Sequence, residues 1–334
     1  MIGTLLALLV FFALFGIFLT QYVPLWMTDN EAQFTNQAGT AFLTFKSGID
    51  SQYALGGPPV LGTPFTISSQ SVPLLTQPTQ GTLTFLSSTC PNGFYARGTS
   101  GETPQNLGQP VTPGYCIFEN QTLSTGPGGS GRTSFSAASG SLEMLLPNRY
   151  YASQTFFYED DGVVQAQSQG YQIMAFAPPF NVTTVASNTT VSSSFLSLTG
   201  NATTVIGQGS QEVYSHLLFN QQLSVNGYNT TTRTLKPFNY TFEIGTLYPC
   251  AWSRFLYQEM NTSGIPYSAT PHPGTSSYNF TNLWVGGFPR SIPYTGSCNN
   301  PTFATTQLVV NMYQIDYATL FYAGVVVSIG VGGT

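Results

Sequence analysis

Charged residues are scarce in this sequence. Asp, Glu, Lys and Arg make up 6% of its 334 residues, against about 25% in a typical soluble domain. The eight basic residues are scattered along the chain, so no cationic stripe is available to neutralise nucleic-acid phosphates. Hydrophobic residues make up 42%, which is too many for a disordered chain. We therefore expect a folded protein with an uncharged polar surface and no nucleic-acid partner.

Catalytic motifs are also missing. The two histidines, His216 and His272, belong to no motif, and the sequence has no G-x-S-x-G, H-E-x-x-H or P-loop pattern. We expect a protein that is not an enzyme, with no catalytic or metal site and no cofactor other than N-linked glycans. The enzymatic alternative is a carbohydrate-active protein in which two of the 13 acids converge as a carboxylate pair.

Four cysteines, Cys90, Cys116, Cys250 and Cys298, form two sequence-local pairs. None has the short C-x2-C to C-x4-C spacing of a structural zinc site. Loop closure favours Cys90 with Cys116 and Cys250 with Cys298 among the three possible connectivities, and each bond would stabilise the fold by about 3 kcal/mol. Four buried thiols are the alternative. Disulfides would imply an oxidising, extracellular location.

The first 28 residues carry no charged side chain, and Asp29 is the first. About 20 apolar helical residues are enough to cross a bilayer. The segment has neither the basic start nor the A-x-A cleavage site of a signal peptide, so we expect the mature protein to retain it. The residues expected to form the membrane span and the core of an assembly are Ile2, Gly3, Leu5, Leu6, Leu9, Phe12, Leu14, Gly16, Phe18, Pro24 and Trp26.

After residue 28 the pattern becomes that of a one-sided helix. Apolar residues recur at steps of three or four from Phe34 to Tyr53, and Gly56-Gly57 followed by Pro58-Pro59 is a stop signal. We predict one long helix over residues 1–57, with an apolar half at 1–28 for lipid or other helices and an amphipathic half at 29–55 that packs on a head. Pro24 should kink it.

Residues 58–334 have the pattern of a mainly-β globular head. Short β-branched and aromatic runs alternate with Gly, Pro, Asn and Ser, which predicts one or two antiparallel β-sandwich units with a possible subdivision near 180–245. The predicted fold class is therefore α+β, a long N-terminal hydrophobic helix followed by this head. The clearest early strands are expected at 65–71, 82–88, 141–146, 150–158, 162–167 and 171–177.

Three other segments of the head have distinct patterns. The acidic run from Glu159 to Gly162 predicts a hairpin turn, because Asp-Gly favours a type I′ turn; half of a calcium site is the alternative. Residues 252–264 have helical spacing. Residues 307–330 predict a buried terminal strand pair; a short membrane span, or a strand donated to a neighbouring subunit, are the alternatives.

Asn-x-Ser/Thr sequons replace charge as a source of solubility. Each could carry a glycan on an extracellular surface, although a polar loop in a Ser/Thr-rich chain is the alternative at every position. The eight candidate glycosylation sites are Asn120, Asn181, Asn188, Asn201, Asn229, Asn239, Asn261 and Asn279.

The start of the chain, Ile2-Gly3-Thr4-Leu5-Leu6 followed by a Leu/Phe/Val run, resembles the mature N-terminal segment of archaeal type IV pilins and archaellins. Four later segments are similar to large pilin-like surface proteins of archaea, which place a hydrophobic helix ahead of a β-rich head. They are QYVPLWMTDNEAQF (Gln21 to Phe34), FKSGIDSQ (Phe45 to Gln52), VPLLTQPTQGTLTF (Val72 to Phe85) and LPNRYYASQTFFYEDDGVVQAQSQG (Leu146 to Gly170).

The resemblance implies a structural subunit of an extracellular, type IV pilus-like filament. Its partners would be copies of itself in a helical polymer, the membrane before assembly, and a pilus assembly machinery. The alternative is a monomeric, membrane-anchored surface glycoprotein. With few carboxylates to protonate, we also expect stability to vary little as the pH falls.

Overall fold

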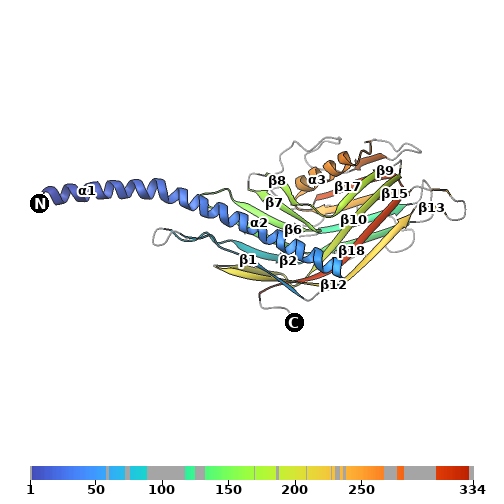
Figure 1. Cartoon of the computed structure of the whole chain (residues 1–334), viewed down its shortest axis with the longest axis horizontal. Coiled ribbons are helices and arrows are strands. Elements are labelled where there is room, and N and C mark those ends of the chain that lie inside the picture. Colours follow the sequence, from blue (N-terminus) through green and yellow to red (C-terminus); the bar gives the residue numbers. More distant parts are fainter. Residues whose placement is uncertain are drawn as a thin grey trace.

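A computed structural model gives the fold of the chain. It describes residues 2–57, 60–71, 76–88, 117–124, 132–168, 170–185, 188–207, 209–226, 228–229, 234–235, 238–266, 277–281 and 306–330. A long N-terminal helix runs along one side of a mainly-β head and projects far beyond it (Figure 1). The predicted fold class, a long hydrophobic helix followed by a mainly-β head, is confirmed.

The helix is continuous from Ile2 to Leu55. It consists of α1 (Ile2–Ile17), a π-helical turn η1 (Phe18–Tyr22) and α2 (Val23–Leu55). It ends where the glycines predict, because Gly56 adopts a left-handed conformation at φ +71° and the Gly57 N–H donates to the Gln52 carbonyl at 3.1 Å. These contacts form a glycine-dependent helix cap.

Pro24 does not break the helix. Proline has no N–H to donate and crowds the carbonyl four residues earlier. The chain accommodates this with the wider π turn directly before it, in which the Val23 N–H bonds to the Phe18 carbonyl five residues back. The kink predicted at Pro24 is therefore replaced by a gently curved helix (Figure 1).

Three main sheets build the head. The first has the order β1 (Leu61–Thr66), β12 (Ser210–Asn226), β18 (Tyr317–Ile329), β10 (Asn188–Thr199), β9 (Phe180–Val185). The second has the order β11 (Thr203–Ile206), β2 (Thr82–Leu86), β5 (Ser141–Leu146), β6 (Gln154–Glu159), β7 (Gly162–Gln167), β8 (Gln172–Phe176). The third has the order β16 (Ser277–Thr281), β17 (Thr306–Ile315), β15 (Phe238–Thr246), β3 (Ile117–Ser124), β4 (Arg132–Ser139).

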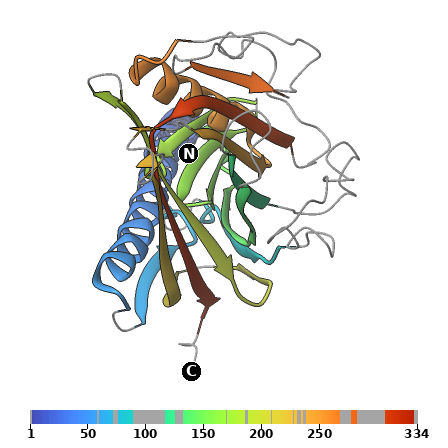
Figure 2. The same cartoon turned by 90° about the vertical axis from the view of Figure 1, so that its right-hand side faces the viewer.

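Two smaller elements complete the head. Strands β13 (Tyr228–Asn229) and β14 (Thr234–Leu235) form a two-stranded ribbon, and helix α3 (Pro249–Thr262) packs against β8, β9 and β17. The predicted helix near 252–264 is thus confirmed, and Gly264 follows its end at φ +72°. Figure 2 shows the sheets and α3 from the end of the head opposite the N-terminus.

Two hydrophobic cores share the long strands β10 and β18. The first core lies between α2 and the first two sheets, and it includes Leu196 of β10 and Val325 of β18. The second core lies under α3 and the third sheet, and it takes Val191 and Leu320 from the other ends of the same strands. The region at 180–245, where the sequence indicates a subdivision, contains β9 to β15 and supplies strands to both cores.

The strand predictions are accurate at two places and shifted elsewhere. Strands β5 and β7 match the expected 141–146 and 162–167, whereas β6 begins at Gln154 instead of residue 150 because the loop before it folds onto α2. The hairpin between β6 and β7 is confirmed. Its two central residues, Asp160 and Asp161, have φ values of +47° and +58°, so the type I′ turn sits one residue earlier than the Asp-Gly pattern predicts.

The C-terminal segment forms strands within its own chain, but they do not pair with each other. β17 lies in the third sheet and β18 lies in the middle of the first, between β12 and β10. The pairing of β18 with β10 is also parallel, in contrast to the otherwise antiparallel pairs of the described strands. Asp316 is the single residue between β17 and β18, where the chain passes from the third sheet to the first. Its carboxylate accepts a hydrogen bond from the Thr189 N–H of β10 at 2.7 Å.

Phe42 provides a test of how the helix is held. Its ring is fully buried and contacts Phe65 of β1 at 5.1 Å and Phe156 of β6 at 5.8 Å between ring centroids. We expect Phe42→Ala to lower the free energy of unfolding by about 3–5 kcal/mol. The matched control is Leu43→Ala, because Leu43 is the next residue and is 44% exposed. Thermal melts of both variants in detergent would be compared, and equal losses would contradict this packing.

Candidate functional site

The apolar half of the helix is exposed on all sides. No residue of α1 is buried, and the exposed fraction reaches 86% at Ile2. The helix is long and apolar enough to cross a membrane, which is a property of membrane anchors and of signal sequences. Of the residues predicted to form the span, Gly16, Phe18 and Pro24 are half-buried and the other eight are exposed.

Aromatic residues mark the point where the helix meets the head. Phe18 stacks on Tyr22 at 6.0 Å and meets Trp26 edge-on at 5.6 Å. Val23 and Met27 are the first buried side chains of the helix. About 20 residues, or 30 Å of helix, therefore lie free before the head begins, which matches the hydrocarbon thickness of a bilayer.

A buried carboxylate fastens the helix at this point. Glu31 is fully buried, and its two oxygens accept hydrogen bonds from the backbone N–H groups of Arg149, Tyr150 and Tyr151 at 2.7–3.0 Å and from the Thr79 hydroxyl at 2.6 Å. Burial alone would raise the pKa of Glu31, but these four donors outweigh it and lower the pKa. The carboxylate is therefore charged and bound in a nest of amides.

A second charged contact holds the upper part of the helix. Lys46 donates to Asp161 in the β6–β7 turn at 2.9 Å and to Asp50 on its own helix at 3.2 Å. Burial lowers the pKa of Lys46, but the two carboxylates reverse the effect and raise it. Asp161 also accepts from the Tyr158 hydroxyl at 2.9 Å.

The same turn joins the two cores through two further acids. Glu159 accepts hydrogen bonds from the Trp252 indole N–H of α3, at 2.5 Å, and from the Thr246 hydroxyl at the end of β15. Asp160 lies beside Glu119 of β3, and the two carboxyl groups shift each other's pKa. Turn residues 159–161 therefore contact α2, α3, β3 and β15 together.

Burial dominates the protonation of these acids. It raises the pKa of Glu159 to about 8 and that of Glu119 to about 7, despite the hydrogen bonds that each accepts. The pKa of Asp161 rises to about 6 because burial outweighs the attraction of Lys46. The pKa of Asp160 rises well above its usual value through burial and the nearby Glu119. Within the described residues no group of three His, Cys, Asp or Glu is arranged to hold a metal ion, so the calcium alternative gains no support from the turn.

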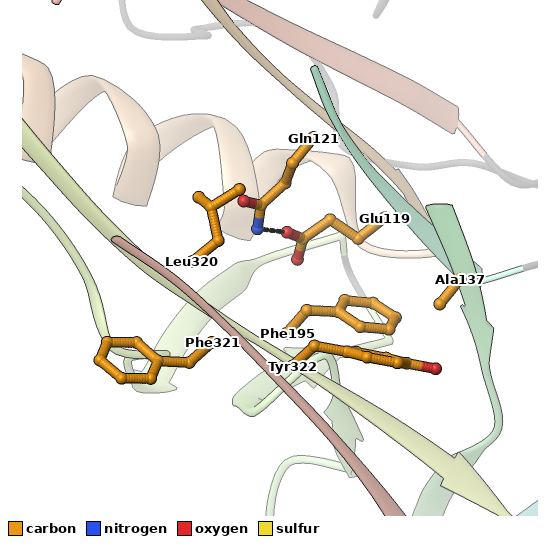
Figure 3. A pocket seen from close by; sticks show the side chains of 7 residues that line it. All are labelled: Glu119, Gln121, Ala137, Phe195, Leu320, Phe321 and Tyr322. Atoms are coloured by element: carbon orange, nitrogen blue, oxygen red, sulfur yellow. Dashed lines mark hydrogen bonds between the residues drawn. The ribbon is translucent and has the colours of Figure 1, made fainter. Parts of the chain in front are cut away.

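A small hollow lies beside this network. Figure 3 shows Glu119 and Gln121 facing one another above the rings of Phe195 and Tyr322, which stack at 5.5 Å. Gln121 donates to Glu119 and accepts from the Ser193 hydroxyl. The space has room for about one water molecule, so the hollow cannot hold a substrate.

The predicted disulfide and glycosylation residues are only partly described. Cys250 is disulfide-bonded at the start of α3. Its partner is one of Cys90, Cys116 and Cys298, which lie outside the described residues, so the connectivity stays a prediction.

The sequons are distributed over the head. Asn181, Asn188, Asn201 and Asn261 are exposed and sterically available for a glycan, and Asn239 is half-buried in β15. The side chains of Asn120, Asn229 and Asn279 lie outside the described part, and use of any sequon stays a prediction.

Sequence reasoning missed the groups that attach the helix. Glu31 and Lys46 fall inside the segment predicted as an amphipathic helix, and the acidic run that contains Asp161 predicts a hairpin turn or half of a calcium site, not a contact with the helix. A signal was available, because in a chain with 6% charged residues a charge on the buried face of a helix needs a partner in the head.

Comparison with family models, with curated proteins and with solved structures finds no match to this chain. The similarity to archaeal pilins therefore rests on the quoted sequence segments.

Glu31→Gln tests the contact between the Glu31 carboxylate and the backbone amides of residues 149–151, which we call the helix clamp. The amide of glutamine carries no charge and turns an NH₂ group toward donors, so we expect a loss of about 1–3 kcal/mol in unfolding free energy. Trypsin should also cleave faster after the exposed Arg149, because its loop loses the anion that orders it. Asp29→Asn is the matched control, since Asp29 is exposed. Unchanged proteolysis in Glu31→Gln would contradict the clamp.

The buried acids predict a pH dependence that differs from the expected flat response. Four of them, Glu119, Glu159, Asp160 and Asp161, have a folded-state pKa above the unfolded value near 4. Their ionisation destabilises the fold at high pH, and this cost is removed as the pH falls. The free energy of unfolding should therefore increase as the pH falls from 8 to 5. Below about pH 4 it should fall again as Glu31 is protonated.

Chemical denaturation midpoints at pH 8, 6, 4.5 and 2.5 measure this profile. Glu159→Gln keeps the shape of the side chain without its charge, and it should raise the melting temperature at pH 8 while leaving that at pH 4.5 nearly unchanged. A midpoint for the unmodified protein that is lower at pH 6 than at pH 8 would refute the assignment.

Proposed function

We propose that this protein is the structural subunit of an extracellular filament. Its N-terminal helices would bundle in the filament core, and its glycosylated β heads would lie outside. The observation that supports this best is that no residue of α1 is buried, although the head already has complete cores of its own. Such a helix needs an apolar environment on all sides, either lipid or other copies of the same helix.

The subunit would be held in the membrane before assembly. Moving the helix from lipid to a bundle exchanges one apolar environment for another, so the gain comes from close packing and from contacts between heads. Gly3 and Ala7, four residues apart, form a small-xxx-small pair that lets helices approach closely. Contacts that repeat without closing a ring generate an open helical polymer.

Replacing a small residue of the Gly3 and Ala7 pair by a large one distinguishes the filament subunit from a monomeric membrane anchor. Ala7→Phe keeps the helix apolar, so membrane insertion should persist, while the yield of filaments sheared from cells should fall several-fold or more. Leu8→Phe is the matched control because it changes a large exposed residue for another. Negative-stain images and mass spectrometry of the filament band would give the yield. Absence of filaments from cells producing the unmodified protein would favour the monomeric surface glycoprotein instead.

A further inference from the structure

The end of the head from which the helix leaves carries an exposed aromatic and cationic loop. This loop, which we call the exit loop, consists of Arg149, Tyr150 and Tyr151. All three side chains are exposed, those of the two tyrosines to 44% and 38%. The loop is not free to drift, because its three backbone amides bind the buried Glu31.

The helix places this loop at a defined height. The Tyr150 carbonyl accepts from the Thr28 hydroxyl at 3.5 Å, so the exit loop lies beside the helix six residues above Tyr22. At 1.5 Å per residue this is about 9 Å above the end of the apolar span. The headgroup layer on each side of a bilayer is about 5–8 Å thick, so long side chains at this height reach it.

The chemistry of the loop fits that layer. Tyrosine and tryptophan prefer the membrane interface because one end of the ring system is apolar and the other is polar. Tyr22 and Trp26 of the helix are residues of this kind, and both are exposed. Among the cationic side chains that the structure describes, the Arg149 guanidinium forms no hydrogen bond or ion pair. Lys46, in contrast, forms two ion pairs, and Arg254 donates to the Gln172 carbonyl. The charge of Glu31 is satisfied by amides, which leaves the Arg149 guanidinium available for a phosphate.

The sheet brings a third tyrosine and a second arginine to the same end. The register of β6 and β7 pairs Gln154 with Gln167, so the turn that follows β7 lies level with the residues just after the exit loop. Tyr171 in that turn is half exposed, and the Arg254 guanidinium lies over its ring at 5.7 Å.

We infer that the exit loop binds the phosphate-bearing headgroups of the membrane that holds the subunit before assembly. Arg149 would contact the phosphate, and Tyr150 and Tyr151 would lie in the interface. The head would then sit on the bilayer by a second contact besides the span. This inference rests on the membrane-held state in the proposed function and does not depend on polymerisation.

Site-specific photo-crosslinking of the full chain tests the inference. A benzophenone amino acid replaces Tyr150 in protein reconstituted into vesicles of equal parts phosphatidylcholine and phosphatidylglycerol, and mass spectrometry identifies the adducts. The same probe at Phe12 reports insertion of the span. The same probe at Tyr317 is the negative control. This exposed tyrosine is the first residue of β18 and pairs with Asn226, the last residue of β12. The next strand after β12, β13, lies at the end of the head far from α1 (Figure 1).

Lipid adducts are expected at positions 12 and 150 and not at 317. The adducts at 150 should favour phosphatidylglycerol several-fold, Arg149→Gln should bring this ratio close to one, and Arg149→Lys should keep it. Adducts at 12 without lipid adducts at 150, adducts at 150 to a second copy of the chain, or equal labelling at 317 would overturn the inference while leaving insertion intact. Absence of adducts at 12 would overturn both the inference and the membrane step of the proposed function.

Discussion

Two buried acids attach the N-terminal helix to the head, and the direction in which the helix leaves the head depends on these contacts. One acid, Glu31, lies on the helix, and the other, Asp161, lies in the head. Glu31 binds the amides of the exit loop at the lower end of the head, and Asp161 binds Lys46 about four helical turns higher. Between them the apolar face of α2 packs into the first core. The free part of the helix therefore continues directly from a segment that is attached to the head at two points.

The few acids of this chain are distributed differently from those of a typical soluble domain. A typical soluble domain spreads its carboxylates over the surface, whereas here several of the 13 acids are deeply buried. Burial raises the pKa of Glu119, Glu159 and Asp160 and so favours their protonated, uncharged form. Much of the polar part of the sequence is instead Ser, Thr, Asn and Gln, which do not titrate in acid. The raised pKa values of these acids therefore predict a fold that gains stability in mildly acidic surroundings, where many proteins begin to lose it.

The sequence predicted the parts of the fold that follow from local patterns. The change from an all-round apolar run to a one-sided stripe gave the helix, and the glycines at 56–57 gave its end. The hairpin at 159–162 and the helix at 252–264 were found in the same way. The parallel pairing of β10 with β18 and the separation of β17 from β18 could not be found, because strand order depends on contacts between residues more than 100 positions apart. The same reason hid the contact of Glu31 with residues 149–151, on which the candidate site depends.

The most direct test of the account is a helical reconstruction, by electron cryo-microscopy, of filaments taken from the surface of cells that make this protein. We predict an axial bundle of helices formed by residues 2–22 of successive subunits, with the β heads outside and without lipid in the core. A population of single subunits, each with its helix in its own patch of lipid and no ordered contact with another copy, would contradict it.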